Sequence, residues 1–148
     1  MTMEIRIAST DEEIAACFPV MQTLRPHLVE SGFVPLVRRL EAGGYRLAYL
    51  EESGRPVAVA GLRTGENIPW GRFMYVDDLV TDPAHRSRGH GARMLAWLRE
   101  YARAAGCEQL RLDSGLQRKD AHRFYEREGM TLASYHFCEI LASGPDRR

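Results

Sequence analysis

The stretch DPAHRSRGHGARML, residues 82–95, decides how the fold of this chain is interpreted. It sets Gly89 and Gly91 among arginines, directly before a run whose apolar residues recur at helical spacing. The start of a helix presents unpaired backbone N–H groups and the positive end of the helix dipole. Glycines let a ligand approach that backbone closely, and Arg86 and Arg88 can donate charge-assisted hydrogen bonds to phosphate oxygens. The stretch therefore predicts a local anion site suited to a pyrophosphate.

Two widespread phosphate-binding motifs do not fit this stretch. The dinucleotide fingerprint Gly-x-Gly-x-x-Gly needs a third glycine, but Met94 stands at that position. The P-loop motif needs Gly-Lys followed by Ser or Thr, and the chain contains no such sequence. What remains is Arg-x-x-Gly-x-Gly, from Arg86 to Gly91, placed after a predicted strand and Pro83.

The composition is that of an ordinary globular protein. The 148 residues are 45% hydrophobic and 27% charged, and the length suits one domain, residues 1–148, with a frayed tail over residues 143–148. Lys and Arg total 20, and so do Asp and Glu, which gives a net charge of zero. A protein that coats nucleic acid usually carries a large basic excess, so no nucleic-acid partner is expected.

The cysteines and the N-terminal segment indicate where the protein works. Cys17, Cys107 and Cys138 show no CxxC spacing, which disfavours a disulfide scaffold and a metal site and is typical of free thiols in a reduced compartment. Residues 1–10 carry charges among short apolar stretches, unlike a signal peptide or a membrane anchor. We therefore expect a cytoplasmic protein that has no membrane partner and binds no metal.

Hydrophobic periodicity and capping residues predict strands and helices in one mixed α/β domain. Thr10 and Glu13 have the spacing of a capping box, which starts a helix that Pro19 should bend and Pro26 should end. Three further helices are expected, over residues 36–41, from residue 91 to about residue 106, and over residues 120–128. The expected strands cover residues 3–8, 45–51, 56–62, 72–81, 109–113, 130–134 and 136–141.

A second motif follows the first. Residues 121–130 read AHRFYEREGM, and the strand before the glycines, residues 76–83, reads VDDLVTDP. The first motif resembles the acetyl-CoA signature of the GNAT superfamily of N-acetyltransferases, (Gln/Arg)-x-x-Gly-x-(Gly/Ala). The second resembles the family's A-x-x-F-Y-x-x-x-G-(F/M), and the order of elements is similar as well. The resemblance implies a mixed α/β fold with a mostly antiparallel sheet flanked by helices, and acetyl-CoA as the cofactor.

The resemblance also implies which residues hold the cofactor. The pantetheine arm would pair, as an added strand does, with the backbone of Leu79, Val80 and Thr81. The side chains of Arg86 and Arg88 would support the pyrophosphate, which would meet the N–H groups of Ser87, Arg88, Gly89, His90, Gly91 and Ala92. One position departs from the family: Arg118 stands where many members carry an Asn that contacts the cofactor.

Acetyl transfer to an amine requires a neutral amine, a polarised carbonyl and a proton for the departing thiolate. Tyr125 stands where the family carries its thiol-protonating tyrosine. Asp77 is the favoured base, which would draw the amine proton through water. Asp78 is the alternative base. The acid at the site could instead simply attract a cationic amine, and Asp78 could equally accept hydrogen bonds from loop N–H groups. Because neighbouring strand residues point to opposite faces, we expect only one of the two to face the cleft.

Two further residues could line the acceptor pocket, and each has a structural alternative. Trp70 could form a wall of the pocket or simply pack, and His122 could face the cleft or lie on the helix surface. His90 is expected to contribute only its backbone. The cysteines lie outside both motifs, so direct transfer within a ternary complex is expected.

Two functions are open to such a chain. The first is an N-acetyltransferase that acts on a primary amine of a small molecule or a protein. The second is a non-catalytic CoA-binding or regulatory module of the same fold, but Tyr125 together with the acidic pair favours the enzyme. Members of the family are often dimers, so the resemblance also allows a homodimer through the terminal strands around Tyr135, His136 and Phe137.

Overall fold

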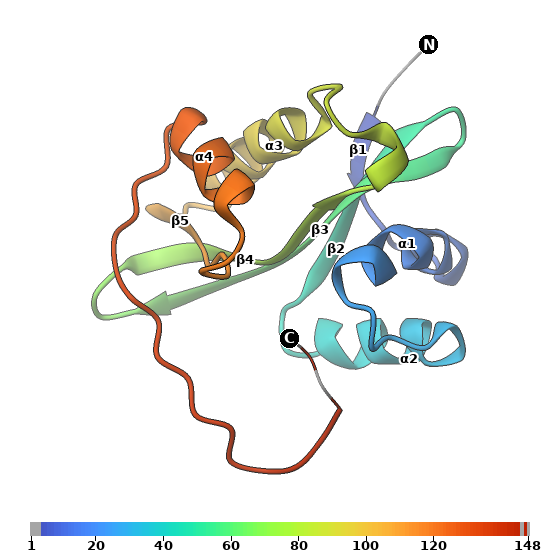
Figure 1. The fold of residues 1–148 in the computed structure, drawn as a ribbon, viewed down its shortest axis with the longest axis horizontal. Coiled ribbons are helices and arrows are strands. Elements are labelled where there is room, and N and C mark those ends of the chain that lie inside the picture. The colour runs from blue at the N-terminus through green and yellow to red at the C-terminus, as the bar shows by residue number, and fades with distance from the viewer. Residues whose placement is uncertain (1–3, 146, 148) are drawn as a thin grey trace.

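A five-stranded sheet is the centre of the fold, with helices on both of its faces (Figure 1). The computed structural model describes residues 4–145 and 147. Strands β1 to β4 pair as antiparallel neighbours in chain order, and β5 joins β4 as a parallel edge strand. The mixed α/β, mostly antiparallel architecture expected from the sequence is confirmed. The strands are β1 (Glu4–Ile7), β2 (Arg46–Glu52), β3 (Arg55–Asn67), β4 (Gly71–Thr81) and β5 (Gln109–Leu112).

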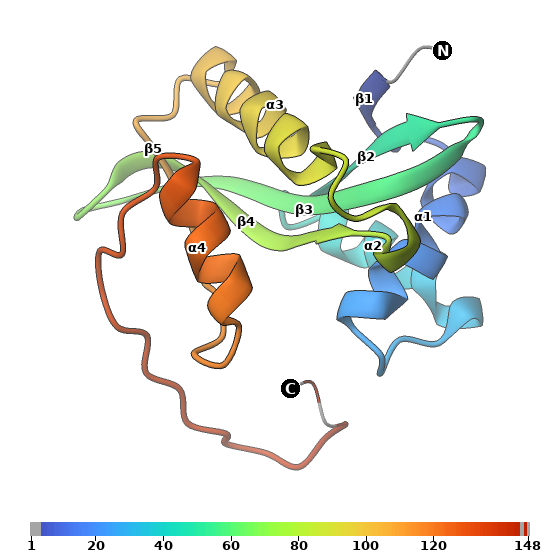
Figure 2. The same ribbon diagram turned by 45° about the horizontal axis from the view of Figure 1, so that its top comes forward.

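The helices lie in two pairs on opposite sides of the sheet (Figure 1, Figure 2). Two apolar clusters result: Phe33 and Val59 belong to the cluster under α1 and α2, and Met74 and Leu98 to the cluster under α3. The burial of apolar surface on both faces of the sheet drives this arrangement. The helices are α1 (Asp11–Leu24), α2 (Glu30–Glu41), α3 (His90–Ala104) and α4 (Lys119–Arg127).

The first helix begins as the sequence predicts. Oγ1 of Thr10 accepts the backbone N–H of Glu13, and the Glu13 carboxylate accepts the N–H of Thr10, so the capping box is complete. Pro19 lies inside α1, and the helix ends at Leu24, before Pro26. Its buried face repeats at helical spacing and includes Ile14, Cys17, Phe18 and Met21.

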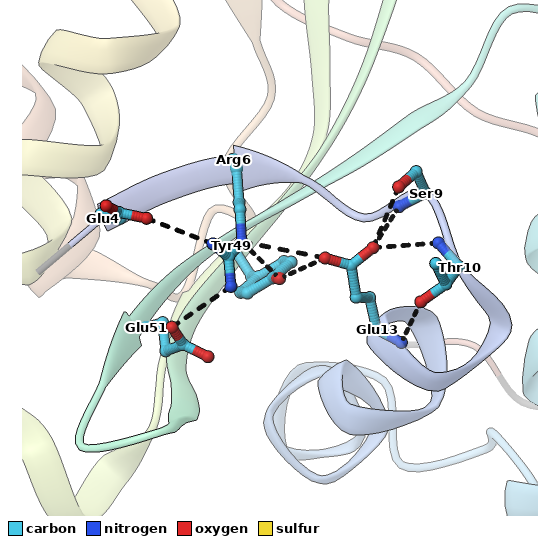
Figure 3. A network of polar contacts seen from close by, with 7 residues as sticks. All are labelled: Glu4, Arg6, Ser9, Thr10, Glu13, Tyr49 and Glu51. Atoms are coloured by element: carbon cyan, nitrogen blue, oxygen red, sulfur yellow. Dashed lines mark hydrogen bonds and ion pairs between the residues drawn. The ribbon is translucent and has the colours of Figure 1, made fainter.

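The Glu13 carboxylate also joins α1 to the first two strands (Figure 3). The Tyr49 hydroxyl on β2 donates to it at 2.9 Å, and Nε of Arg6 on β1 donates to the Tyr49 oxygen at 2.8 Å. The backbone N–H groups of Thr10 and Ser9, followed by the Tyr49 hydroxyl, lower the pKa of Glu13 to about 2. The network therefore stabilises the ionised carboxylate in the folded state.

Two elements are longer than the sequence predicts. Helix α2 begins at Glu30 rather than at residue 36, because burial of Phe33 outweighs the weak helix propensity around it. Strand β3 continues to Asn67 rather than ending near residue 62, because β4 pairs with it as far as that residue. In both cases contacts distant in sequence extend an element beyond its local signal.

The two strands predicted at residues 130–134 and 136–141 are wrong. Residues 130–141 carry no regular secondary structure. A strand needs a hydrogen-bonded neighbour, and within residues 4–145 and 147 no other strand pairs with this segment. Residue 3 of the first predicted strand, and residues 146 and 148 of the predicted frayed tail, lie outside the described residues.

The Glu13 network predicts a pH effect on stability. The folded-state pKa of Glu13 lies below the ordinary value of 4.5. The ionised Glu13 carboxylate therefore stabilises the folded protein above that pH, and this stabilisation is lost as the pH falls toward about 2. We expect Glu13→Gln to be less stable than the wild type at neutral pH and to lose less stability across this acid range. Urea unfolding at several pH values measures both. The neighbouring exposed Glu12→Gln is the control, and an unchanged acid slope in Glu13→Gln would contradict the assignment.

Candidate active site

A β-bulge in β4 places an extra residue at the centre of the site. The antiparallel register pairs Gly61 with Asp78 but Leu62 with Val76, so Asp77 has no partner on β3. A residue inserted in this way bends its strand and increases the local twist. The bulge therefore sits at the first of the two acidic residues singled out from the sequence.

Beyond the bulge, β4 separates from β5. The parallel pairing of these strands ends at Val76 and Leu112, although β4 itself continues to Thr81. Residues 79–81 still pair with β3 on their other side. In the described part of the chain their outward backbone groups thus face no strand, which is the arrangement that pairing with a pantetheine arm would need.

The bulge also changes which way the two carboxylates point. Val76 and Leu79 both pack into the α3-side cluster although they are three residues apart. Asp77 and Asp78 therefore both lie on the α1 and α2 side, and they contact Arg63 and the end of α1 respectively. The expectation that adjacent residues point to opposite faces is wrong here, because the bulge interrupts the alternation of the strand.

Asp78 is held by two partners from outside the sequence motifs. Nε of Arg25 and the hydroxyl of Tyr45 each donate to its carboxylate at 2.9 Å, and the Asp78 side chain is only 15% exposed. Burial, followed by the nearby Asp78 charge, raises the pKa of Tyr45 well above its usual value. A Cβ at Gly61 would stand 2.0 Å from the Tyr45 hydroxyl oxygen, so only glycine leaves room for this contact.

Asp77 faces both an arginine and a small cavity. Nε and Nη2 of Arg63 donate to its two oxygens at 2.7 and 2.8 Å. The cavity lies where β4 and β5 separate, and its walls also include Leu79, Asp113, Arg118 and Tyr125. Its volume of about 30 Å³ leaves room for a water molecule beside Asp77.

Tyr125 lines this cavity from α4. Burial raises the pKa of its phenol, and the positive charge of Arg118 opposes the shift only in part. The phenol therefore stays protonated at neutral pH, as a proton donor must. The structure thus brings Asp77 and Tyr125, 48 positions apart in the chain, to the walls of one cavity.

The glycines of the phosphate-loop motif have two different physical roles. Gly89 is the N-cap of α3 with a φ of 78°, and nothing lies within 4 Å of the place where a Cβ would stand. Ser87, two residues earlier, also has a left-handed backbone conformation, with a φ of 66°. Gly91 instead packs against α4, since a Cβ there would lie 3.3 Å from Cζ of Phe124. Conformation and open space thus explain Gly89, whereas helix packing explains Gly91.

The first turn of α3 fits an anionic group. It contains no acidic residue, and the side chains of Arg86 and Arg88 are exposed beside it. The His90 ring is buried, with Nε2 lying 3.5 Å from Oε2 of Glu52, so its backbone alone faces the loop surface. Glu52 also lies 4.0 Å from Nη1 of Arg88. The residues present therefore suit a pyrophosphate held by backbone N–H groups and arginines.

Trp70 and His122 are not among the walls of this cavity. Trp70 packs edge-on against Phe73 with ring centroids 5.1 Å apart, and the Arg111 guanidinium lies 4.1 Å from its ring centroid. Nε2 of His122 lies 2.7 Å from the carbonyl oxygen of Gly115. Both residues thus make local contacts, which agrees with the structural alternatives given for them and not with a place in the wall of this cavity.

Several residues of the site carry no local motif. Arg25, Tyr45, Arg63 and Glu52 reach the acidic pair or the loop from elements far away in sequence. Only Gly61 gives a signal, because a glycine inside a strand pattern indicates a bulge or a close approach.

Residues 8–130 match the model of the acetyltransferase (GNAT) family. The chain belongs to the GNAT family. It is 37% identical over 131 residues to the uncharacterized N-acetyltransferase YhdJ of Bacillus subtilis, which covers 87% of this chain and 92% of that protein. An aminoalkylphosphonate N-acetyltransferase of Salmonella typhimurium is 41% identical over 66 residues, 45% of this chain and 43% of that protein.

Solved structures show the same fold. An aminoglycoside N-acetyltransferase in complex with CoA superposes with a TM-score of 0.83 at 12% identity, covering 96% of both chains. Glucosamine-6-phosphate N-acetyltransferase from Arabidopsis thaliana superposes with a TM-score of 0.77 at 18% identity, over 96% of this chain and 100% of that chain. This GNAT protein is therefore an N-acetyltransferase, and its family implies acetyl-CoA as the co-substrate. Among its described residues, no helix is long and apolar enough to cross a membrane.

The close approach at Gly61 predicts a large effect of one methyl group. Gly61→Ala should destabilise the GNAT protein by about 1–3 kcal/mol, because the new Cβ would overlap the Tyr45 hydroxyl and the Asp78 carboxylate. Gly32→Ala in α2 is the control, since its Cβ would meet nothing within 4 Å and should raise stability by up to about 1 kcal/mol. Thermal unfolding measures both, and wild-type stability in Gly61→Ala would contradict the packing described.

Proposed function

We propose that this GNAT protein transfers the acetyl group of acetyl-CoA directly to a primary amine, within a ternary complex. The observation that carries the proposal is that Asp77 and Tyr125 line one cavity at the place where β4 separates from β5. A proton acceptor and a proton donor thus flank the position that the open edge of β4 offers to the cofactor arm. Acetyl-CoA supplies the activated acetyl group and a thiolate leaving group.

The cofactor would lie along three successive features. The backbone of residues 79–81 would pair with the pantetheine arm, and the N–H groups of residues 87–92 would bind the pyrophosphate. The exposed side chains of Arg86 and Arg88 would add charge-assisted hydrogen bonds. Arg118 lines the cavity at the N-cap of α4, in place of the Asn common in the family.

The proton transfers follow from the positions of the two side chains. Tyr125 would give its phenolic proton to the departing sulfur as negative charge develops there, and its raised pKa ensures that the phenol is protonated at neutral pH before this transfer. Asp77 would accept the proton of the attacking amine through a water molecule, while Arg63 fixes the carboxylate. Asp78 is committed to Arg25 and Tyr45, so we propose for it a structural role.

A direct transfer is favoured over a covalent acetyl-cysteine. Burial raises the pKa of Cys17 to about 12, which keeps it a thiol, and a thiol is a poor nucleophile. Cys107 and Cys138 are absent from the walls of the cavity. Initial-rate patterns should therefore be sequential, with both substrates bound before any product leaves.

The acceptor is proposed to be a small amine. A second cavity, of about 300 Å³, lies between α1 and α2 and is lined by Leu28, Phe33, Tyr45 and Asp78. Arg25 lines both cavities, so the second cavity lies next to the first. An amine screen should compare aminoalkylphosphonates, the acceptors in the name of the Salmonella relative, with arylalkylamines and with a lysine peptide. Acetylation of the peptide alone would place the acceptor among proteins.

Gly89 provides the test of the cofactor site. Gly89→Ala should weaken acetyl-CoA binding at least about 10-fold, because a φ of 78° is strained for alanine and the loop must shift. Gly44→Ala is the matched control: its φ is 100°, nothing lies within 4 Å, and it is remote from the loop. Calorimetric titration measures both variants. Equal weakening in the two would mean that strain acts on the whole protein and not on the site.

Tyr125 provides the test of catalysis. Tyr125→Phe should lower kcat by about 100-fold or more while leaving the Kd of acetyl-CoA within about twofold. Tyr101→Phe on α3, where the ring stacks on Trp97 at 5.0 Å, controls for loss of a half-buried hydroxyl. Unchanged turnover in Tyr125→Phe would remove the phenol from the mechanism. Acetyl-CoA binding without turnover on any amine of the screen would favour the non-catalytic module.

A further inference from the structure

The phosphate loop, residues 86–91, contains a buried ionisable side chain that the proposed proton transfers do not use. The His90 ring is only 2% exposed, and its Nε2 lies 3.5 Å from Oε2 of Glu52, the last residue of β2. Within the part of the chain that the structure describes, neither nitrogen of this ring has a hydrogen-bond partner, and neither has Oε2 of Glu52. Buried polar atoms without a partner are rare and cost free energy, so this pair calls for a functional explanation.

The Glu52 carboxylate lies near side chains from both sides of Gly89. Its Oε2 is 4.0 Å from Nη1 of Arg88, which precedes Gly89, and 3.5 Å from Nε2 of His90, which follows it. The backbone between them is unusual, because Ser87 and Gly89 have left-handed φ values of 66° and 78°. A non-glycine residue keeps such a conformation only where the surrounding structure holds it. The carboxylate at the end of β2 is therefore in a position to hold the loop.

The charges around the His90 ring oppose one another. Among the described residues, Glu52 is the one carboxylate within ion-pair distance of the ring. Arg88 lies in the loop, Arg93 lies one turn further along α3, and Arg55 on β3 stands opposite Glu52 in the strand register. The positive end of the α3 dipole also lies at His90, the first residue of that helix. A positive charge on the ring is thus favoured by Glu52 and opposed by the arginines and the helix end.

A bound pyrophosphate would shift this balance. It would place negative charge at the N–H groups of residues 87–92, next to a ring that is shielded from water, where Coulomb interactions are strong. We propose that His90 and Glu52 are positioning residues for acetyl-CoA. When the cofactor binds, His90 takes up a proton from the solvent and closes onto Glu52, which shortens their 3.5 Å separation to the about 2.8 Å of a charge-assisted hydrogen bond. The pair acts through the loop backbone and touches no part of the cofactor.

Proton uptake by His90 makes cofactor binding depend on pH, and it rests on the cofactor site proposed above. Histidine is the side chain that ordinarily changes charge near neutral pH. Because the bound state then holds more protons than the free state, the affinity for acetyl-CoA rises as the pH falls through this range. Arginines and backbone N–H groups alone would take up no proton, since arginine keeps its charge throughout this range. The pH dependence of binding therefore reports on the pair and not on the rest of the loop.

Calorimetric titration with acetyl-CoA in buffers of different ionisation enthalpy counts the protons taken up. At about pH 7 the wild type should take up at least about 0.3 proton more than His90→Gln, and its affinity should rise at least about 3-fold more between about pH 8 and about pH 6. A terminal phosphate of the cofactor titrates near this range, so the difference between the two proteins is the readout. His85→Gln is the matched control. Nδ1 of His85 lies 3.4 Å from Oδ2 of Asp82, and this variant should keep the wild-type proton count.

Glu52→Gln tests the pair from its other member. This variant keeps the size of a side chain that is 20% exposed, so the protein should fold. It should lose the same proton uptake and weaken acetyl-CoA binding at least about 5-fold at about pH 6, with less effect at about pH 8. The double variant with His90→Gln should bind no more weakly than the weaker single variant, because both changes remove one interaction.

The outcomes separate the pair from the cofactor site. Equal proton uptake in the wild type and both variants, or its loss in His85→Gln, would overturn the proposal. Weakening that is the same at both pH values would show a purely structural role and would also overturn it. Failure of the wild type to bind acetyl-CoA would instead overturn the proposed cofactor site, and the role of the pair with it.

Discussion

The extra residue at Asp77 is the constraint on which the rest of this structure depends. The inserted residue directly follows Val76, the last residue of β4 that pairs with β5, and a bulge bends its strand at that point. All four residues of β5 pair with β4, so the edge of β4 at residues 79–81 lies beyond the end of β5. The same insertion turns two neighbouring acids to one side of the sheet.

The surrounding charges hold the bulge in place. Arg63 on β3 clamps Asp77 with two hydrogen bonds, and Arg25 at the end of α1 bonds both the Asp77 carbonyl and the Asp78 carboxylate. The Tyr45 hydroxyl satisfies the other oxygen of Asp78. Side chains from three separate parts of the chain therefore converge on two consecutive residues of one strand. The two carboxylates therefore have different surroundings: that of Asp77 lines the cavity, and that of Asp78 binds Arg25 at the end of α1.

The parts of the fold that the sequence predicts are those with local signals. The capping box at Thr10, the helix after Gly89 and the motif around Tyr125 are each specified by residues near one another in the chain. The bulge has no local sequence signal apart from Gly61, because it depends on the register between two strands. The contacts of Arg25 and Arg63 with the acidic pair have no sequence signal, because the local sequence around an arginine does not indicate which distant carboxylate it binds. The segment of residues 130–141 shows the opposite error: its pattern suits strands, but a strand requires a hydrogen-bonded neighbour, which the local pattern does not supply.

The contact between Gly91 and Phe124 ties the two motifs of the chain to each other. One motif contains Gly91 in the first turn of α3, and the other contains Phe124 and, one residue further along α4, Tyr125. The Phe124 ring occupies the space next to Gly91 that a Cβ would need, so the size of the side chain at one position limits the size allowed at the other. In related chains these two positions should therefore vary together, with a larger residue at the first matched by a smaller or displaced ring at the second. Covariation between these two positions would reflect the packing of α3 against α4, although both positions belong to motifs associated with cofactor binding and catalysis.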